Sequence, residues 1–324
     1  MRLTQPLLKL PISFCAETLA AEVRALPKSD WVPHPTGYVG NEAVRLVTPG
    51  GRPTDHIEGP MAPTPELLRC PYIMQVMAEL DGVWGRSRLM GLGPGAEVPS
   101  HVDIHYYWRT HLRIHIPVIT SPKVSFTCSG ETVHMAAGEC WVFDSFRGHN
   151  VVNGGAEQRV HLVLDTVGGT RLWDLIEAAQ AGNAEVMTVM PRETATDGLL
   201  YEQVNAPKVM SPWEMRCHLA FLYEHTQPHP KLDAVTRKMD RFVTAWTAIW
   251  TKYGTADEGL GAYRDLVLEV RRELNHSGGA GIRLVNKMPL FLFFEELIFK
   301  MAISPRAERL VSPALGINEE RLAS

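Results

Sequence analysis

Short segments of alternating polar and apolar residues dominate the chain between about residues 31 and 169. Such alternation places successive side chains on opposite faces of an extended strand. The clearest segments are 109–118, 124–128, 140–144 and 159–165. Turn residues such as Asn153-Gly154-Gly155 separate them. Short strands at regular spacing favour an all-β sandwich or barrel for this region.

From residue 170 onward the spacing of the apolar residues becomes helical. Ser211 followed by Pro212 and Glu214 is a good helix start, with Ser as the N-cap and Pro in the first turn. Segments 230–253, 260–274 and 289–302 repeat apolar residues at helical intervals. We therefore expect two domains. A β-rich domain covers residues 1–169, with a helical segment near its N-terminus, and a helical domain covers residues 170–324.

The composition excludes several classes of protein. The 324 residues carry a net charge of -4, without the basic excess by which nucleic-acid-binding proteins neutralise phosphates. The five cysteines are scattered and form no C-x-x-C pair, which favours a cytoplasmic protein over a disulfide framework or a zinc ribbon. The most apolar late stretch, 289–303, is short and contains charged residues, so we expect a buried helix there and no membrane span.

His101, Asp103 and His149 form a possible set of metal ligands. His101 and Asp103 are two residues apart, so both side chains point to one side of an extended strand end. His149 must then come from a strand that folds back beside them, as in a jelly roll. Two imidazoles and one carboxylate on one face of an octahedron leave the other face open, which is typical of non-haem Fe(II) oxygenases. His-x-Asp often occurs by chance, so the residues around it decide whether it is read as a metal site.

One face of the strand expected at 109–118 is basic throughout. It carries only Arg and His side chains, at Arg109, His111, Arg113 and His115. The opposite face is aliphatic, and the strand at 159–165 repeats this split with Arg159 and His161 on its polar face. A merely solvated face would include Lys, Glu, Ser or Thr. We therefore expect a polar barrel interior, in which Arg159 binds the far carboxylate of 2-oxoglutarate through its guanidinium fork.

At these residues the sequence resembles the aspartyl/asparaginyl β-hydroxylase superfamily, which includes the bacterial free-proline hydroxylases. The resemblance covers roughly residues 31–169. It is tightest at His101-Val-Asp103, Arg113-Ile-His115-Ile-Pro117, the segment 133–141, His149 and the segment 159–165. It implies a mainly β fold with α, in which a double-stranded β-helix (jelly-roll, cupin-like) core precedes a C-terminal helical domain. The animal aspartyl/asparaginyl hydroxylases have glycine at the position of Asp103, so this chain leans toward the small-molecule or bacterial branch.

The resemblance also implies a role for particular residues. The catalytic iron is expected on His101, Asp103 and His149. The co-substrate 2-oxoglutarate is expected on Arg159, assisted by Arg113 and His115. The substrate carboxylate is expected on Arg86, Arg88 and Arg109, which match arginines proposed for this task in proline 3-hydroxylase. The number of residues between Asp103 and Arg109 is much smaller in this sequence than in that enzyme.

Trp31, His34 and Tyr38 lie in a segment rich in Pro, Gly and aromatic residues that precedes the barrel strands. The segment resembles the N-terminal lip of the free-proline hydroxylases, in which a Tyr and a Gly-Gly turn flank a short strand. We expect these three side chains to contribute to the substrate pocket, because loops on a rigid scaffold commonly carry specificity. The alternative is that Trp31 and Tyr38 seal the end of the barrel.

The leading interpretation is an Fe(II)- and 2-oxoglutarate-dependent dioxygenase that hydroxylates a C–H bond of a free amino acid. It would consume O₂ and release succinate and CO₂, with ascorbate as the expected reductant in vitro. Two enzyme alternatives keep this chemistry but act on Asp or Asn in a peptide or protein, or on an acyl group. An alternative of another class is a cupin-like metal- or ligand-binding protein without turnover. Such a protein would have no use for the paired carboxylate clamp of Arg159 and Arg113.

Overall fold

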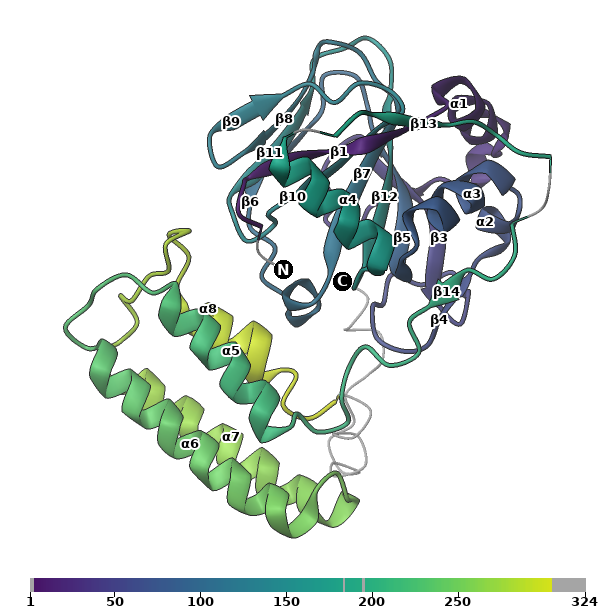
Figure 1. Cartoon of the computed structure of the whole chain (residues 1–324). Coiled ribbons are helices and arrows are strands. Elements are labelled where there is room, and N and C mark those ends of the chain that lie inside the picture. The colour runs from purple at the N-terminus through teal and green to yellow at the C-terminus, as the bar shows by residue number, and fades with distance from the viewer. Residues whose placement is uncertain (1–2, 183, 194–195, 305–324) are drawn as a thin grey trace. The chain divides into compact units, whose positions relative to one another are not determined.

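The computed structural model describes residues 3–182, 184–193 and 196–304, which fall into two compact units (Figure 1). Unit 1 comprises residues 1–103 and 107–205, and unit 2 comprises residues 104–106 and 206–324. The chain thus leaves unit 1 after Asp103, returns to it at Tyr107 and leaves it again after Asn205. The strands gather in unit 1 and the long helices in unit 2, which confirms the predicted combination of a β-rich part and a helical part.

Unit 1 is built on two β-sheets. The larger sheet has the order β13 (Met187–Val189), β1 (Leu7–Phe14), β10 (Glu139–Phe143), β7 (Leu112–Ile119), β12 (Arg159–Thr166), β5 (Val83–Leu92), β3 (Asn41–Pro49) and β2 (Val32–Pro33). Two short strands extend it, β4 (Met61–Pro63) beside β3 and β14 (Leu200–Tyr201) beside β5. The smaller sheet has the order β6 (Glu97–His101), β11 (His149–Asn153), β8 (Val124–Cys128) and β9 (Glu131–Val133). The two sheets form the predicted jelly-roll core.

Alternation along the strands gives the larger sheet two different faces. One face packs against helices α1 (Ala16–Ala25), α3 (Pro71–Leu80) and α4 (Thr170–Ala181). This main core includes Leu19, Ile73, Ile114, Leu162 and Leu172. The other face meets the smaller sheet through a second core that includes Phe126, Phe143 and Val151. Both cores are stabilised mainly by apolar burial, which contributes roughly 25 cal/mol per Å² removed from water.

Strand β7 begins at Leu112 and not at Arg109, so the expected strand at 109–118 is wrong at its start. Tyr106–Arg109 forms a 3₁₀ turn instead, and the carbonyl of Tyr107 accepts the backbone N–H groups of Thr110 and His111. Arg109 and His111 therefore lie outside the alternation. The other predicted strands appear as β8, β10 and β12, nearly at the expected bounds. The N-terminal segment is helical only in part, since β1 precedes α1.

The division between the units lies near residue 205, beyond the boundary expected at 169. Helix α4 packs against the main core through Leu172 and Ile176. Strands β13 and β14 pair in parallel with β1 and β5 and so add to the larger sheet. Because these three elements complete unit 1, the helical part of the chain begins only after Asn205.

Unit 2 contains helices α5 (Pro212–Glu224), α6 (Leu232–Tyr253), α7 (Leu260–Asn275) and α8 (Leu290–Phe294), the last continued by a π-helical turn at Glu295–Phe299. Ser211 caps α5 as predicted, because its Oγ accepts the backbone N–H of Glu214 at 3.2 Å. The Glu214 carboxylate in turn accepts a hydrogen bond from the hydroxyl of Tyr106. Unit 2 therefore binds the three-residue segment 104–106 by a specific polar contact.

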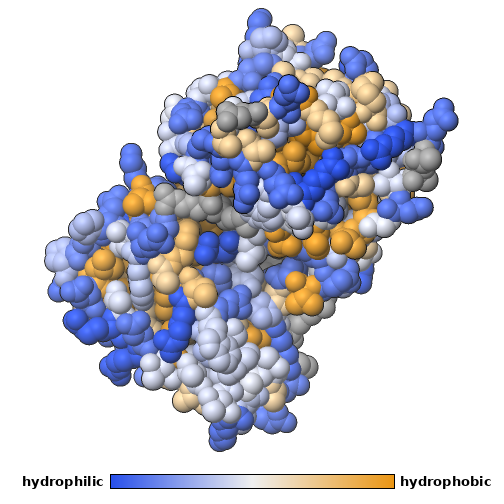
Figure 2. Space-filling model, viewed as in Figure 1, coloured by the Kyte–Doolittle hydropathy of each residue, from blue (hydrophilic) through white to orange (hydrophobic). Residues whose placement is uncertain are grey.

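The longest helix, α6, buries one apolar stripe, which includes Val235, Met239, Phe242 and Trp246. Its remaining positions are mostly polar, as an amphipathic helix on a compact core requires. On the surface drawn in Figure 2, hydrophilic and apolar residues are interspersed. Within the described residues, none of the helices has the length and the apolar character needed to span a membrane.

Gly138 offers a test of how β1 and β10 are joined. Its φ is +80°, and a Cβ at this position would lie 2.2 Å from the backbone oxygen of Phe14. We expect Gly138→Ala to lower the free energy of unfolding by more than the roughly 1–2 kcal/mol of left-handed geometry alone, because β1 would have to move. Gly130→Ala is the matched control, since its φ is +85° and nothing lies within 4 Å of the added carbon. Equal thermal midpoints for the two variants would contradict the close-contact explanation.

Candidate metal centre

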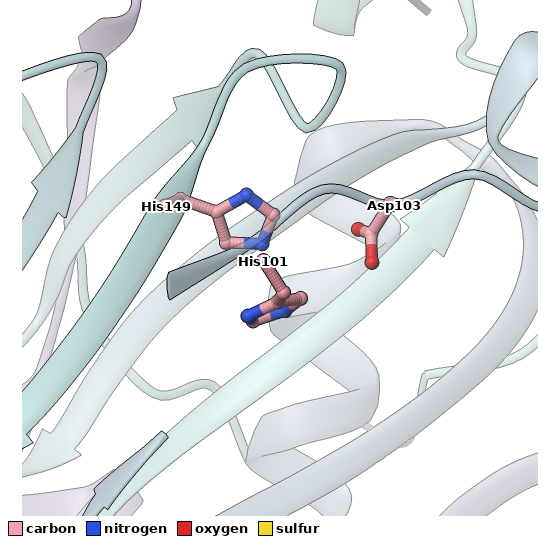
Figure 3. Close-up of side chains that lie close together, drawn as sticks. All are labelled: His101, Asp103 and His149. Carbon is pink, nitrogen blue, oxygen red and sulfur yellow. The ribbon is translucent and has the colours of Figure 1, made fainter. Parts of the chain in front are cut away.

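The predicted ligands meet at one end of the smaller sheet. His101 ends β6 and His149 begins β11, and the antiparallel register of these strands sets the two histidines opposite each other. Asp103 follows two residues later, where its backbone N–H donates to the carbonyl of Ser145 at 3.1 Å. One ligand atom from each of the three residues lies within 4.8 Å of the other two (Figure 3). This spacing fits a single bound ion.

Backbone carbonyls fix the tautomer of both imidazoles. Nδ1 of His101 lies 2.8 Å from the carbonyl of Pro99, and Nδ1 of His149 lies 3.0 Å from that of Arg147. A carbonyl can only accept, so each Nδ1 carries the proton and each Nε2 keeps its lone pair for a metal. Burial, together with the neighbouring His101, lowers the pKa of His149 to about 4. Two imidazoles beside one carboxylate are the donor set that suits Fe(II).

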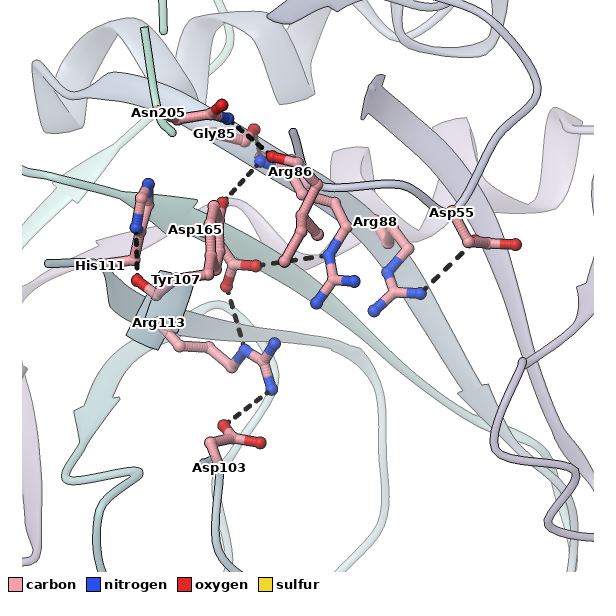
Figure 4. A network of polar contacts seen from close by, with 12 residues as sticks. Asp55, Gly85, Arg86, Arg88, Asp103, Tyr107, His111, Arg113, Asp165 and Asn205 are labelled. Carbon is pink, nitrogen blue, oxygen red and sulfur yellow. Dashed lines mark hydrogen bonds and ion pairs between the residues drawn. The ribbon is translucent and has the colours of Figure 1, made fainter. Parts of the chain in front are cut away.

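A charged network holds Asp103 from behind. Arg113 on β7 donates Nη1 to Asp103 at 3.4 Å and Nε to Asp165 on β12 at 3.0 Å (Figure 4). Its guanidinium carbon lies 4.0 Å from the centre of the Trp108 ring. Burial lowers the pKa of Arg113, but the Asp165 and Asp103 carboxylates outweigh this and raise it above its ordinary value. Arg113 therefore orients a candidate metal ligand, and its expected part in binding 2-oxoglutarate stays a prediction.

A cavity of about 440 Å³ opens beside the three ligands and is lined at another point by Arg159 on β12. Arg159 is only 5% exposed, and its Nε and Nη2 have no hydrogen-bond partner among the described residues. Burial lowers its pKa to about 9, which leaves the group charged at neutral pH. Nδ1 of His115, on the adjacent β7, likewise lacks a partner within the described ranges. A buried cation without a counter-ion is costly, so this part of the cavity suits an anion.

Four of the residues predicted to bind substrate also line the cavity. Arg86 and Arg88 reach it from β5, and His34 and Tyr38 reach it from the loop between β2 and β3. Tyr38 is 37% exposed, so it lies toward solvent. Burial and then the positive charges of Arg88 and Arg86 lower the pKa of His34 to about 3, so its imidazole is neutral. The positive charge on this wall of the cavity therefore comes from Arg86 and Arg88 and not from His34.

Trp31 and Arg109, which were also predicted to bind substrate, are not among the residues that line the cavity. Trp31 packs against the main core, where its ring would lie 2.9 Å from a Cβ at Gly91. Arg109 is displaced because it ends the 3₁₀ turn before β7.

Three further residues that line the cavity were not predicted from the sequence, namely Asp55, Trp108 and Asp165. Asp165 shares the inward face of β12 with Arg159, so the alternation of that strand could have identified it. Trp108 lies in a turn and Asp55 in the loop between β3 and β4. No periodicity indicates the direction of a side chain in such segments.

The chain is similar to several solved structures. A 2OG-Fe(II) oxygenase-family oxidoreductase from Burkholderia pseudomallei matches at 14% identity over 48% of this chain and 81% of that chain, with a TM-score of 0.33. A prolyl-4-hydroxylase from Pseudomonas putida matches at 14% identity over 52% of this chain and 94% of that chain, with a TM-score of 0.35. A predicted oxalate decarboxylase from Thermotoga maritima matches at 18% identity over 42% and 89% of the two chains, with a TM-score of 0.26.

The model of the Aspartyl/Asparaginyl beta-hydroxylase family matches residues 58–168. This segment contains β4 to β12, and with them all three candidate metal ligands and Arg159. The resemblance seen in the motifs is thereby confirmed. Over residues 58–168 the chain is therefore similar to the Aspartyl/Asparaginyl beta-hydroxylase family.

Proposed function

We propose that this protein is an Fe(II)- and 2-oxoglutarate-dependent dioxygenase that hydroxylates a C–H bond of a free amino acid. One observation carries the proposal: a single cavity contains both the His101, Asp103, His149 set and the buried Arg159, whose Nε and Nη2 have no hydrogen-bond partner among the described residues. A metal site alone would not require a buried cation nearby. A co-substrate with a metal-binding end and a distal carboxylate needs both.

The residues of this chain divide the work among them. His101, Asp103 and His149 would hold Fe(II) and leave the other face of its octahedron open. Bound iron would supply the activation of O₂, coupled to the conversion of 2-oxoglutarate into succinate and CO₂, that places one oxygen atom on the substrate carbon. Arg159 would bind the distal carboxylate through two N–H groups, and His115 would add a third donor. Phe126 and Phe143 line the same cavity and would exclude water from it.

The substrate carboxylate is assigned to the part of the cavity lined by β5, the strand next to β12. Arg86 and Arg88 line that wall, and a carboxylate in a partly dry pocket needs a cationic partner. His34 and Tyr38 would shape the entrance. The assignments of Arg109 and Trp31 to substrate binding stay predictions, as does the cytoplasmic location.

Two alternatives keep the iron chemistry but act on Asp or Asn in a peptide or protein, or on an acyl group. The remaining alternative is a cupin-like binding protein without turnover. Incubation of the full chain with Fe(II), ascorbate, O₂ and 2-oxoglutarate separates a dioxygenase from a binding protein, because only a dioxygenase forms succinate. Mass spectrometry of a panel of amino acids and peptides would then identify the substrate by the gain of one oxygen atom.

Removal of His149 should abolish metal binding. We expect His149→Ala to lose more affinity for Fe(II) or Co(II) than the roughly 10–100-fold that follows the loss of an outer partner of a ligand. His134→Ala is the matched control, because His134 also places Nδ1 beside a carbonyl, that of Val124 at 3.1 Å, but does not line the cavity. Stoichiometric metal and full turnover in His149→Ala would disprove the ligand assignment.

Arg159 should determine the affinity for 2-oxoglutarate. We expect Arg159→Gln to weaken binding of 2-oxoglutarate to the metal-loaded protein by on the order of 3–5 kcal/mol, because a buried carboxylate would lose its charged partner. Arg159→Lys keeps the charge but not the fork, so its affinity should fall between the two. Titration calorimetry gives the three dissociation constants, and equal values would refute the role.

Arg86 and Arg88 should matter for substrate and not for co-substrate. We expect Arg86→Ala and Arg88→Ala to lose hydroxylation of the identified substrate while the substrate-free conversion of 2-oxoglutarate to succinate continues. Arg109→Ala is measured beside them, because Arg109 was also predicted to bind substrate but does not line the cavity. Measured side by side, normal hydroxylation by all three variants would move the substrate site elsewhere.

A further inference from the structure

The part of the cavity lined by Arg86 and Arg88 is the substrate wall. Each of the two carboxylates near it, Asp165 and Asp55, lies close to two guanidinium groups (Figure 4). Asp165 accepts a hydrogen bond from Nε of Arg113 at 3.0 Å, while Nε of Arg86 stays 3.7 Å from its other oxygen. The Asp165 carboxylate is only 2% exposed. Asp165 is therefore shared, since it accepts a hydrogen bond from Arg113 and forms a longer ion pair with Arg86.

Asp55 repeats this arrangement on the other side of β5. Its two oxygens accept Nε and Nη2 of Arg45, at 3.1 and 2.5 Å, in a bidentate pair. Nη1 of Arg88 lies 3.7 Å from the same carboxylate, beyond hydrogen-bond distance. Asp55 is therefore shared in the same way, since it is hydrogen-bonded to Arg45 and forms a longer ion pair with Arg88.

The four guanidinium groups of Arg45, Arg86, Arg88 and Arg113 thus share the two carboxylates of Asp55 and Asp165, so two positive charges remain unbalanced on this wall. Nε of Arg86 and Nη1 of Arg88 have no hydrogen-bond partner within the part of the chain that the structure describes. Burial, and then the positive charges of Arg86 and Arg113, lower the pKa of Arg88 well below its ordinary value. The remaining carboxylate of the cavity lining, that of Asp103, belongs to the metal set. His34 is neutral and adds no charge.

The bound metal and co-substrate do not change this balance. A divalent ion is neutralised by Asp103 and the metal-binding carboxylate of 2-oxoglutarate, and Arg159 is neutralised by the distal carboxylate. The wall of Arg86 and Arg88 would keep its two positive charges, and a substrate with one carboxylate could pair with only one of the two arginines. A substrate with two carboxylates would give each arginine a partner.

We propose that the substrate is a small dicarboxylate, an acidic amino acid, which presents one carboxylate to Arg86 and the other to Arg88. The two arginines are two residues apart on one strand, so their Cα atoms are separated by about 6.7 Å and both side chains point into the same cavity. One small molecule can therefore contact both. This inference rests on the proposed function, of which it names the substrate class.

Isosteric pairs of amino acids test the proposal directly. The full chain is loaded with Zn(II), which binds the same donor types without redox chemistry, and with saturating 2-oxoglutarate. Calorimetry then compares L-aspartate with L-asparagine and L-glutamate with L-glutamine, with L-proline as a monocarboxylate. We expect at least one acid to bind roughly tenfold or more tightly than its amide and than proline. The preference should vanish in Arg86→Gln or Arg88→Gln and persist in Arg24→Gln, which removes an exposed arginine from α1. Equal binding of acids and amides, or tighter binding of proline, would overturn the proposal.

A second measurement needs no ligand. If Arg88 is an uncompensated buried cation, Arg88→Gln should raise the thermal midpoint of the ligand-free protein, whereas Arg24→Gln should leave it unchanged. A lower midpoint for Arg88→Gln would show that Asp55 already balances Arg88, and the proposal would fail even where no amino acid binds. Formation of succinate by the wild-type protein with Fe(II) is measured separately. If no succinate forms, the proposed function is refuted, but the measured effect of Arg88→Gln on stability is not affected.

Discussion

Alternation of side chains across β5, β7 and β12 is the constraint on which unit 1 depends. Because successive residues point to opposite faces, the same strand supplies Ile114 to the main core and Arg113 to the cavity. A shift of one residue in register would bury the arginines under the helices and expose the aliphatic residues. The apolar side therefore fixes the register, and the register in turn places every charged group of the cavity.

The energetic cost of that cavity is concentrated in its cations. Arg113 is held by two carboxylates, so its burial is compensated within the protein. Arg159 has no such partner among the described residues and relies on what enters the cavity. The difference separates a residue whose charge is balanced by neighbouring carboxylates from one whose charge is not balanced among the described residues. Sites of this kind are commonly less stable than they could be, since their unpaired groups are kept for binding.

Those features that follow from strand periodicity could be predicted from the sequence. The inward direction of Arg159 and His115 and the meeting of His101 with His149 follow from the period of two and from the chemistry of the ligands. The direction of Arg109 could not be predicted, because a local turn interrupts the pattern before β7. Asp55 lies in a loop that folds back so that its carboxylate makes a bidentate contact with Arg45 on β3. The end of the β-rich domain was predicted too early, because the helical pattern of α4 resembles that of the later helices. Local periodicity does not show that α4 packs on the core of unit 1.

The interruption of unit 1 by residues 104–106 has a consequence for the order in which the protein matures. During synthesis the ribosome delivers Asp103 long before it delivers Glu214, the partner of Tyr106. The contact between Tyr106 and Glu214 can therefore form only after helix α5 has emerged. Residues 104–106 thus acquire this contact within unit 2 after the last strand of unit 1, β14, has been synthesised.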